Sequence, residues 1–139
     1  MRLAANTGCR LHLIEPLGFT LDDARLRRAG MDYRERAVVQ VHADLDAWRA
    51  AARPDRVFAL SGSGATRYSD VRFEAGDSLM FGPESAGLGK LVLEAGWLTD
   101  VLRIPMQPGV RSLNLANAVS VVIYEAWRQH DFSGGGAFR

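Results

Sequence analysis

The stretch Asp77-Ser78-Leu79-Met80-Phe81-Gly82-Pro83 is a short, largely apolar run that stops at a glycine-proline turn. Runs of this length between turn residues are typical of buried strands. The same pattern occurs at residues 56–60, before the turn Ser61-Gly62-Ser63-Gly64, and at residues 101–104, before Pro105. The sequence therefore predicts three strands, each followed by a turn that presents backbone groups.

The most regular helical pattern lies near the C-terminus, over residues 114–130. Its apolar positions recur at helical spacing: Leu115, Ala118, Val119, Val122 and Ala126. Further strands are expected over residues 11–15 and 37–41, and further helices over residues 20–30, 44–48 and 88–95. Strands that alternate with helices predict an α/β fold, with a parallel sheet covered by helices on both faces and ligands bound beyond the carboxyl ends of the strands.

A chain of 139 residues has room for one domain with its own core. We expect this domain to span residues 1–132, because Ser133-Gly134-Gly135-Gly136 is typical of a flexible tail that would run to residue 139. The formal net charge is only +1. A uniformly basic surface is thereby excluded, and any contact with nucleic acid must be a local patch.

Three features indicate a cytoplasmic protein without a membrane segment. Cys9 is the single cysteine and cannot form an intramolecular disulfide. No apolar run approaches the length of a membrane span, and the N-terminus lacks the layout of a signal peptide. The histidines, at positions 12, 42 and 130, have no acidic or thiol neighbours at the spacing of metal ligands, so no metal is predicted.

Several polar features leave two interpretations open. The loops Gly82-Pro83-Glu84 and Pro105-Met106-Gln107-Pro108-Gly109 could bind a ligand through their backbone or could be ordinary turns. Asn114 and Asn117 could cap a helix or serve as partners of a ligand. The cluster Arg25, Arg27 and Arg28 could contact phosphate or could simply complement the dipole of its helix.

Three segments of the C-terminal half carry a family resemblance. They are Leu79-Met-Phe-Gly-Pro-Glu84 with Gly87-Leu88, then Arg103-Ile-Pro-Met106, and then Arg111-Ser-Leu-Asn-Leu-Ala-Asn-Ala-Val-Ser120 continuing into Tyr124-Glu-Ala-Trp-Arg128. Residues 5–8, 11–16 and 23–33 extend the likeness over nearly the whole chain. Together they resemble the SPOUT superfamily of knotted methyltransferases, and within it the small enzymes that methylate the ribose 2′-hydroxyl of the wobble nucleotide, position 34, of tRNA.

This resemblance implies a cofactor, S-adenosyl-L-methionine, and a deep trefoil knot near the C-terminus. The residues that it assigns to the cofactor are Leu60, Gly82, Ile104, Met106, Ser112 and Leu113. It also implies a homodimer that binds the anticodon stem-loop of tRNA. The apolar face of the C-terminal helix is then expected to pack partly across a two-fold axis.

The resemblance further assigns Arg2, Asn114 and Tyr124 to catalysis and substrate binding. Because a guanidinium stays protonated in proteins, we expect Arg2 to clamp a phosphate or stabilise the alkoxide rather than to act as a base. Relatives begin with a strand before the helix that carries this arginine, so the first strand is expected to be missing here. The same motifs leave two other functions open: 2′-O-methylation of rRNA or of another tRNA position, and RNA binding with weak catalysis.

Overall fold

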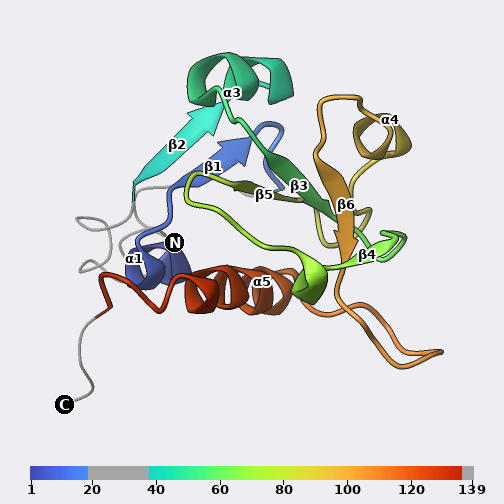
Figure 1. Cartoon of the computed structure of the whole chain (residues 1–139). Coiled ribbons are helices and arrows are strands. Elements are labelled where there is room, and N and C mark those ends of the chain that lie inside the picture. The colour runs from blue at the N-terminus through green and yellow to red at the C-terminus, as the bar shows by residue number, and fades with distance from the viewer. Residues whose placement is uncertain (19–37, 136–139) are drawn as a thin grey trace. The chain divides into compact units, whose positions relative to one another are not determined.

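The computed structural model describes residues 1–18 and 38–135 (Figure 1). The chain divides into two compact units, Met1–Arg53 and Pro54–Arg139. The helix expected over residues 20–30, with its cluster Arg25, Arg27 and Arg28, lies outside the described residues.

The first unit contains a two-stranded parallel sheet. Strand β1 (Leu11–Ile14) pairs with β2 (Val39–His42), with Leu11 opposite Val39. Helix α1 (Arg2–Thr7) precedes β1 and ends at Gly8, whose φ of 73° is in the left-handed region that glycine adopts without strain. Helix α3 (Leu45–Ala52) follows β2, and the carboxylate of Asp44 caps it by accepting a hydrogen bond of 2.7 Å from the amide of Ala47.

The second unit contains a four-stranded sheet in the order β4-β6-β3-β5, and every pair in it is parallel. The strands are β3 (Val57–Leu60), β4 (Thr66–Arg67), β5 (Ser78–Phe81) and β6 (Asp100–Arg103). A 3-10 turn, η2 (Tyr68–Asp70), follows β4, and the helices are α4 (Lys90–Leu93) and α5 (Leu115–Gln129). The predicted parallel α/β architecture is therefore confirmed.

The core of the second unit forms between the sheet and α5, the long helix at the red end of the colour scale in Figure 1. Phe58 of β3, Leu102 of β6 and Val122 of α5 are buried in one cluster with Phe73. The rings of Phe58 and Phe73 meet edge to face with their centroids 5.6 Å apart. Burial of these apolar side chains fixes α5 against the sheet.

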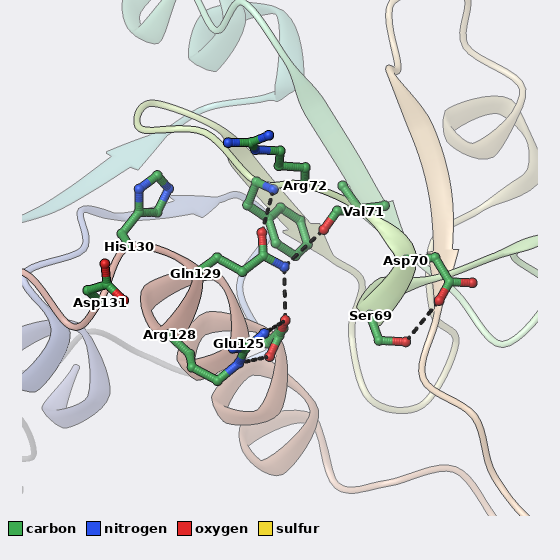
Figure 2. Close-up of a pocket in the computed structure, with 10 residues that line it drawn as sticks. Ser69, Asp70, Val71, Arg72, Glu125, Arg128, Gln129, His130 and Asp131 are labelled. Atoms are coloured by element: carbon green, nitrogen blue, oxygen red, sulfur yellow. Dashed lines mark hydrogen bonds and ion pairs between the residues drawn. The ribbon is translucent and has the colours of Figure 1, made fainter.

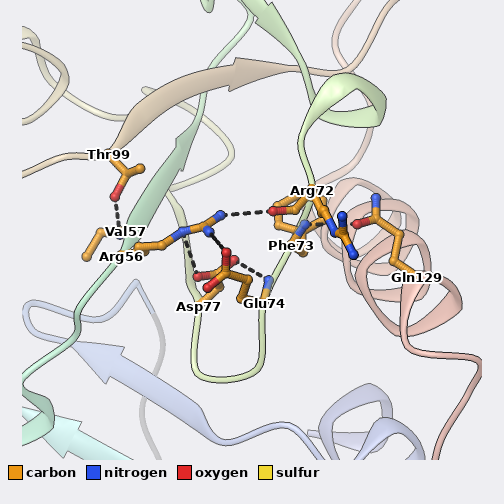
Figure 3. Close-up of polar contacts among 8 residues, drawn as sticks. All are labelled: Arg56, Val57, Arg72, Phe73, Glu74, Asp77, Thr99 and Gln129. Atoms are coloured by element: carbon orange, nitrogen blue, oxygen red, sulfur yellow. Dashed lines mark hydrogen bonds and ion pairs between the residues drawn. The ribbon is translucent and has the colours of Figure 1, made fainter.

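Arg56, one residue before β3, ties the loop before β5 to the sheet (Figure 3). Its guanidinium forms ion pairs with Glu74 at 2.6 Å and with Asp77 at 3.1 Å, and Nη2 donates to the carbonyl of Arg72 at 3.0 Å. The same guanidinium lies 4.9 Å from the centroid of the Phe58 ring. The loop is thereby held where β5 must start to pair with β3.

The structure corrects two details of the sequence-based predictions. The helix expected over residues 88–95 is only α4, because glycines at positions 89 and 96 flank it and Leu91 is 90% exposed rather than packed. The short strand β4 was missed, since its two residues carry no apolar pattern. On the apolar face of α5, Val122 and Ala126 pack on the chain's own core.

Candidate functional site

The candidate site lies at the carboxyl ends of β3, β5 and β6. In this sheet Leu60 is opposite both Phe81 of β5 and Leu102 of β6, so the three strands end at the same edge. Gly82 follows Phe81 directly, and Ile104 lies two residues beyond Leu102. Three of the six residues assigned to the cofactor, Leu60, Gly82 and Ile104, are thus brought to one edge, where parallel sheets bind their ligands.

Gly82 is required by the shape of the loop that follows β5. A Cβ at this position would overlap the backbone of Gly87 and Leu88, and would lie 2.6 Å from the carbonyl oxygen of Gly87. The loop returns to Gly82 because the amide of Gly87 donates a hydrogen bond of 2.7 Å to the carbonyl of Pro83. The loop is therefore closed on itself, and only glycine fits at its first position.

The segment between β6 and α5 holds the other three assigned residues: Met106, Ser112 and Leu113. All three are exposed: the exposed fraction is 42% for Met106 and 40% for Leu113. This segment makes a turn at Pro108-Gly109, and none of its side chains forms a hydrogen bond with another residue that the structure describes. Backbone groups beside exposed apolar side chains suit a ligand with a polar-edged aromatic base and a ribose, so these residues fit the adenosyl group.

Asn114 joins the two loops of this edge. Its Oδ1 accepts a hydrogen bond of 2.9 Å from the amide of Ala116, so it caps α5. Its Nδ2 donates a hydrogen bond of 3.1 Å to Oε1 of Glu84, in the loop after β5. The sequence predicted a cap or a ligand contact for this residue, but it gave no signal of the partnership with Glu84.

Tyr124 is not close to Asn114 in the same chain. The two residues are ten positions apart along α5, which corresponds to about 15 Å at the rise of an α-helix. Tyr124 is 43% exposed, and its ring meets that of Trp127 at 5.7 Å between centroids. Arg2, the third residue assigned to catalysis, begins α1 in the first unit and is exposed.

A separate cavity of about 530 Å³ lies between α5 and residues 69–73 (Figure 2). Gln129 crosses one side of it: Nε2 donates to the carbonyl of Val71 at 2.9 Å, and Oε1 accepts from the amide of Phe73 at 2.8 Å. Hydrogen bonds from Arg128 and Gln129 lower the pKa of Glu125 to about 2. None of the residues assigned to the cofactor lines this cavity.

The search for a membrane-spanning helix and for a metal site covers residues 1–18 and 38–135. No helix in these ranges is long and apolar enough to span a membrane. Nor do these ranges contain a group of three or more histidine, cysteine, aspartate or glutamate side chains that could hold a metal ion.

Comparisons with known proteins agree with this geometry. The sequence profile of the SpoU rRNA Methylase family matches residues 1–124. The chain is 54% identical over 137 residues to a Burkholderia pseudomallei protein named tRNA (cytidine(34)-2′-O)-methyltransferase, a match that covers 97% of this chain and 88% of the relative.

Solved structures give the same result. One, described as giving structural insights into the 2-OH methylation of C/U34 on tRNA, is 48% identical with a TM-score of 0.84, and the match covers 94% of this chain and 85% of that one. AviRb, a SpoU methyltransferase from Streptomyces viridochromogenes solved with AdoMet, is 27% identical with a TM-score of 0.72, over 95% of this chain and 54% of that one. This chain therefore belongs to the SpoU methylase family.

Proposed function

We propose that this protein transfers a methyl group from S-adenosyl-L-methionine to the ribose 2′-hydroxyl of nucleotide 34, a cytidine or uridine, of tRNA. The observation that carries this proposal is the 54% identity, along 97% of the chain, to a relative named for that reaction. The carboxyl edge of the second unit supplies a site of the required chemistry. We place the reaction in the cytoplasm, in keeping with the free thiol of Cys9.

The cofactor is assigned to Leu60, Gly82, Ile104, Met106, Ser112 and Leu113. When bound, it supplies a methyl group activated by a sulfonium. Gly82 keeps the loop closed, while backbone groups of residues 105–113 are available to the base and ribose. The exposed side chains of Met106 and Leu113 offer apolar surface that a bound ligand would cover.

The trefoil knot is part of this proposal. In such a knot the segment after β6 passes through the loop after β5 before α5 begins. One observation supports it: the start of α5 is bonded to the loop after β5 through Asn114 and Glu84. Because knots are rare in proteins, an arrangement of this kind is most easily explained by what it holds, here the cofactor.

The chain's own residues must orient the ribose hydroxyl and stabilise its oxygen as the proton leaves. Asn114 is fixed by two hydrogen bonds and is assigned to positioning the substrate. Arg2 is assigned to a phosphate of the substrate or to the developing alkoxide, since a guanidinium does not accept a proton. Tyr124 is assigned to holding the substrate.

A homodimer would explain the position of Tyr124. This residue and Val121 form an exposed part of α5 that does not pack on the chain's own core. Because Tyr124 lies about 15 Å along the helix from Asn114, it reaches a site more readily across a subunit interface than within its own chain. We therefore propose that each active site combines residues of two protomers.

The test uses purified protein, labelled S-adenosyl-L-methionine, and separate pools of unmodified tRNA and rRNA. We expect label in tRNA alone, and none in tRNA that already carries a 2′-O-methyl group at nucleotide 34. Label in rRNA alone would favour the second candidate, an rRNA methyltransferase, which the description of the family supports. RNA binding without any label would favour the third, a catalytically weak RNA-binding protein.

A further inference from the structure

Two arginines, Arg67 and Arg103, lie side by side at the edge of the second unit's sheet. β4 is the edge strand, and its pairing with β6 places Thr66 opposite Leu102 and Arg67 opposite Arg103. Leu102 is fully buried, and successive residues of a strand point to opposite faces. Arg67 and Arg103 therefore share the other face, and both are exposed.

This arrangement is unfavourable in the free protein. Like charges directly opposite on paired strands destabilise a sheet. Asp70 offsets one of the two charges, since its Oδ2 accepts from Nε of Arg67 at 2.8 Å. In the part of the chain that the structure describes, no carboxylate pairs with Arg103.

The pair is also held in place by its surroundings. Nη1 of Arg103 donates a hydrogen bond of 3.2 Å to the carbonyl of Gly64, in the turn before β4. That turn is pressed onto β6, because a Cβ on Gly64 would lie 2.5 Å from the carbonyl carbon of Leu102. The hydrogen bond therefore links the guanidinium of Arg103 to a turn that lies close against β6.

We propose that Arg67 and Arg103 together bind a backbone phosphate of the RNA substrate. The inference rests on the proposed function, to which it adds a substrate contact outside the residues assigned to the cofactor and to catalysis. Two adjacent guanidinium forks match the oxygens of a phosphodiester, and a bound phosphate removes the repulsion between them. Arg103 directly precedes Ile104, so the phosphate is held next to the cofactor site. Because the net charge is only +1, such a local pair rather than overall charge must attract the RNA.

The test compares tRNA binding by Arg67→Gln and Arg53→Gln over a range of salt concentrations. Arg53 is an exposed arginine at the end of α3 in the first unit, so its variant removes the same charge elsewhere. Loss of one charge-assisted contact is expected to raise the Kd for tRNA about tenfold and to lower the salt slope by about one. The Arg53 variant should match the wild type. Arg67→Lys keeps the charge but loses the guanidinium fork, so it should keep the salt slope and recover only part of the affinity.

Asp70→Asn provides a variant with the opposite expected effect, because it frees Nε of Arg67 and removes a competing carboxylate. We expect it to bind tRNA several-fold more tightly than the wild type at low salt. The midpoint of thermal unfolding, measured for each variant, keeps a loss of folding from being taken for a loss of affinity.

The outcomes separate this inference from the proposed function. If the wild type methylates nucleotide 34 but Arg67→Gln binds tRNA with unchanged Kd and salt slope, the phosphate site is wrong and the function stands. If Arg67→Gln instead weakens binding of S-adenosyl-L-methionine measured by calorimetry, the pair serves the cofactor's carboxylate and the RNA contact is again wrong. If the Arg67-dependent binding is found but nucleotide 34 stays unmethylated, the phosphate site is supported and the proposed function is overturned.

Discussion

Asn114 donates a hydrogen bond of 3.1 Å to Glu84, which lies thirty residues earlier in the chain. The bond connects the loop after β5 with the first turn of α5, the two segments between which the cofactor is proposed to bind. The amide of Ala116 holds Oδ1 of Asn114, and the bond to Glu84 holds Nδ2, so both ends of the side-chain amide have a partner. We therefore expect Glu84 to act as a positioning residue through Asn114.

Replacing Glu84 tests this relationship. Glu84→Ala removes the acceptor and is expected to lower kcat/KM for tRNA methylation about threefold to tenfold, as for the loss of one exposed hydrogen bond. Glu84→Gln keeps an oxygen at the same position and should stay close to the wild type. Steady-state methylation of tRNA measures both variants. Equal rates for Glu84→Ala and the wild type would show that the bond does not position Asn114.

Gly82→Ala tests the closed loop after β5. The added methyl would overlap the backbone of Gly87 and Leu88, so the loop must open or shift. We expect a loss of about 1–3 kcal/mol in the free energy of unfolding and much weaker binding of S-adenosyl-L-methionine. Gly89→Ala is the matched control, because a Cβ there meets no atom within 4 Å and φ is −66°. Calorimetry measures cofactor binding by both variants, and denaturant unfolding measures their stability. If Gly82→Ala binds the cofactor as tightly as Gly89→Ala and is equally stable, the closed loop is not required.

Gln129→Ala tests the bridge between α5 and residues 71–73. The change leaves the carbonyl of Val71 and the amide of Phe73 without their partner in a partly buried place. We expect the free energy of unfolding to fall by about 1–3 kcal/mol, while cofactor binding by the folded protein is unchanged. Gln107→Ala, at an exposed position in the loop after β6, serves as the control for stability. A Gln129 variant as stable as this control would contradict the bridge.

The low pKa of Glu125 predicts that the free energy of unfolding decreases at low pH. Folding lowers this pKa from 4.5 to about 2, chiefly through the hydrogen bonds from Arg128 and then Gln129. The ionised form is favoured in the folded protein, so its contribution is fully present above pH 4.5 and is lost as the pH falls toward 2. Unfolding measured from about pH 6 to about pH 2.5 should show a smaller decrease for Glu125→Gln than for the wild type. Identical pH profiles would contradict this assignment.

The sequence predicted the elements that rest on local patterns. The strands β3, β5 and β6 are continuous apolar runs between turns, and α5 has a regular apolar face. β4 could not be predicted, because its two residues, Thr66 and Arg67, become a strand only by pairing with β6. Its existence depends on the tertiary structure rather than on the local sequence.

For the candidate site, the sequence predicted the features that are local and missed the contacts between distant positions. Turns after strands are visible in the sequence, and parallel pairing then brings their residues to one edge. The partnership of Asn114 with Glu84 and that of Gln129 with Phe73 join positions 30 and 56 residues apart, which no local pattern encodes. Helical spacing predicted that one face of α5 is buried, but it does not show which surface covers that face; the structure shows that Val122 and Ala126 pack on the chain's own core.

Alkaline hydrolysis of tRNA treated with the protein and S-adenosyl-L-methionine tests the central claim most directly. Cleavage of RNA by alkali requires a free 2′-hydroxyl, so a 2′-O-methyl group leaves one gap in the ladder of fragments. We predict a single gap, at nucleotide 34, that is absent without the cofactor. A complete ladder, or a gap at any other nucleotide, would contradict the proposed function.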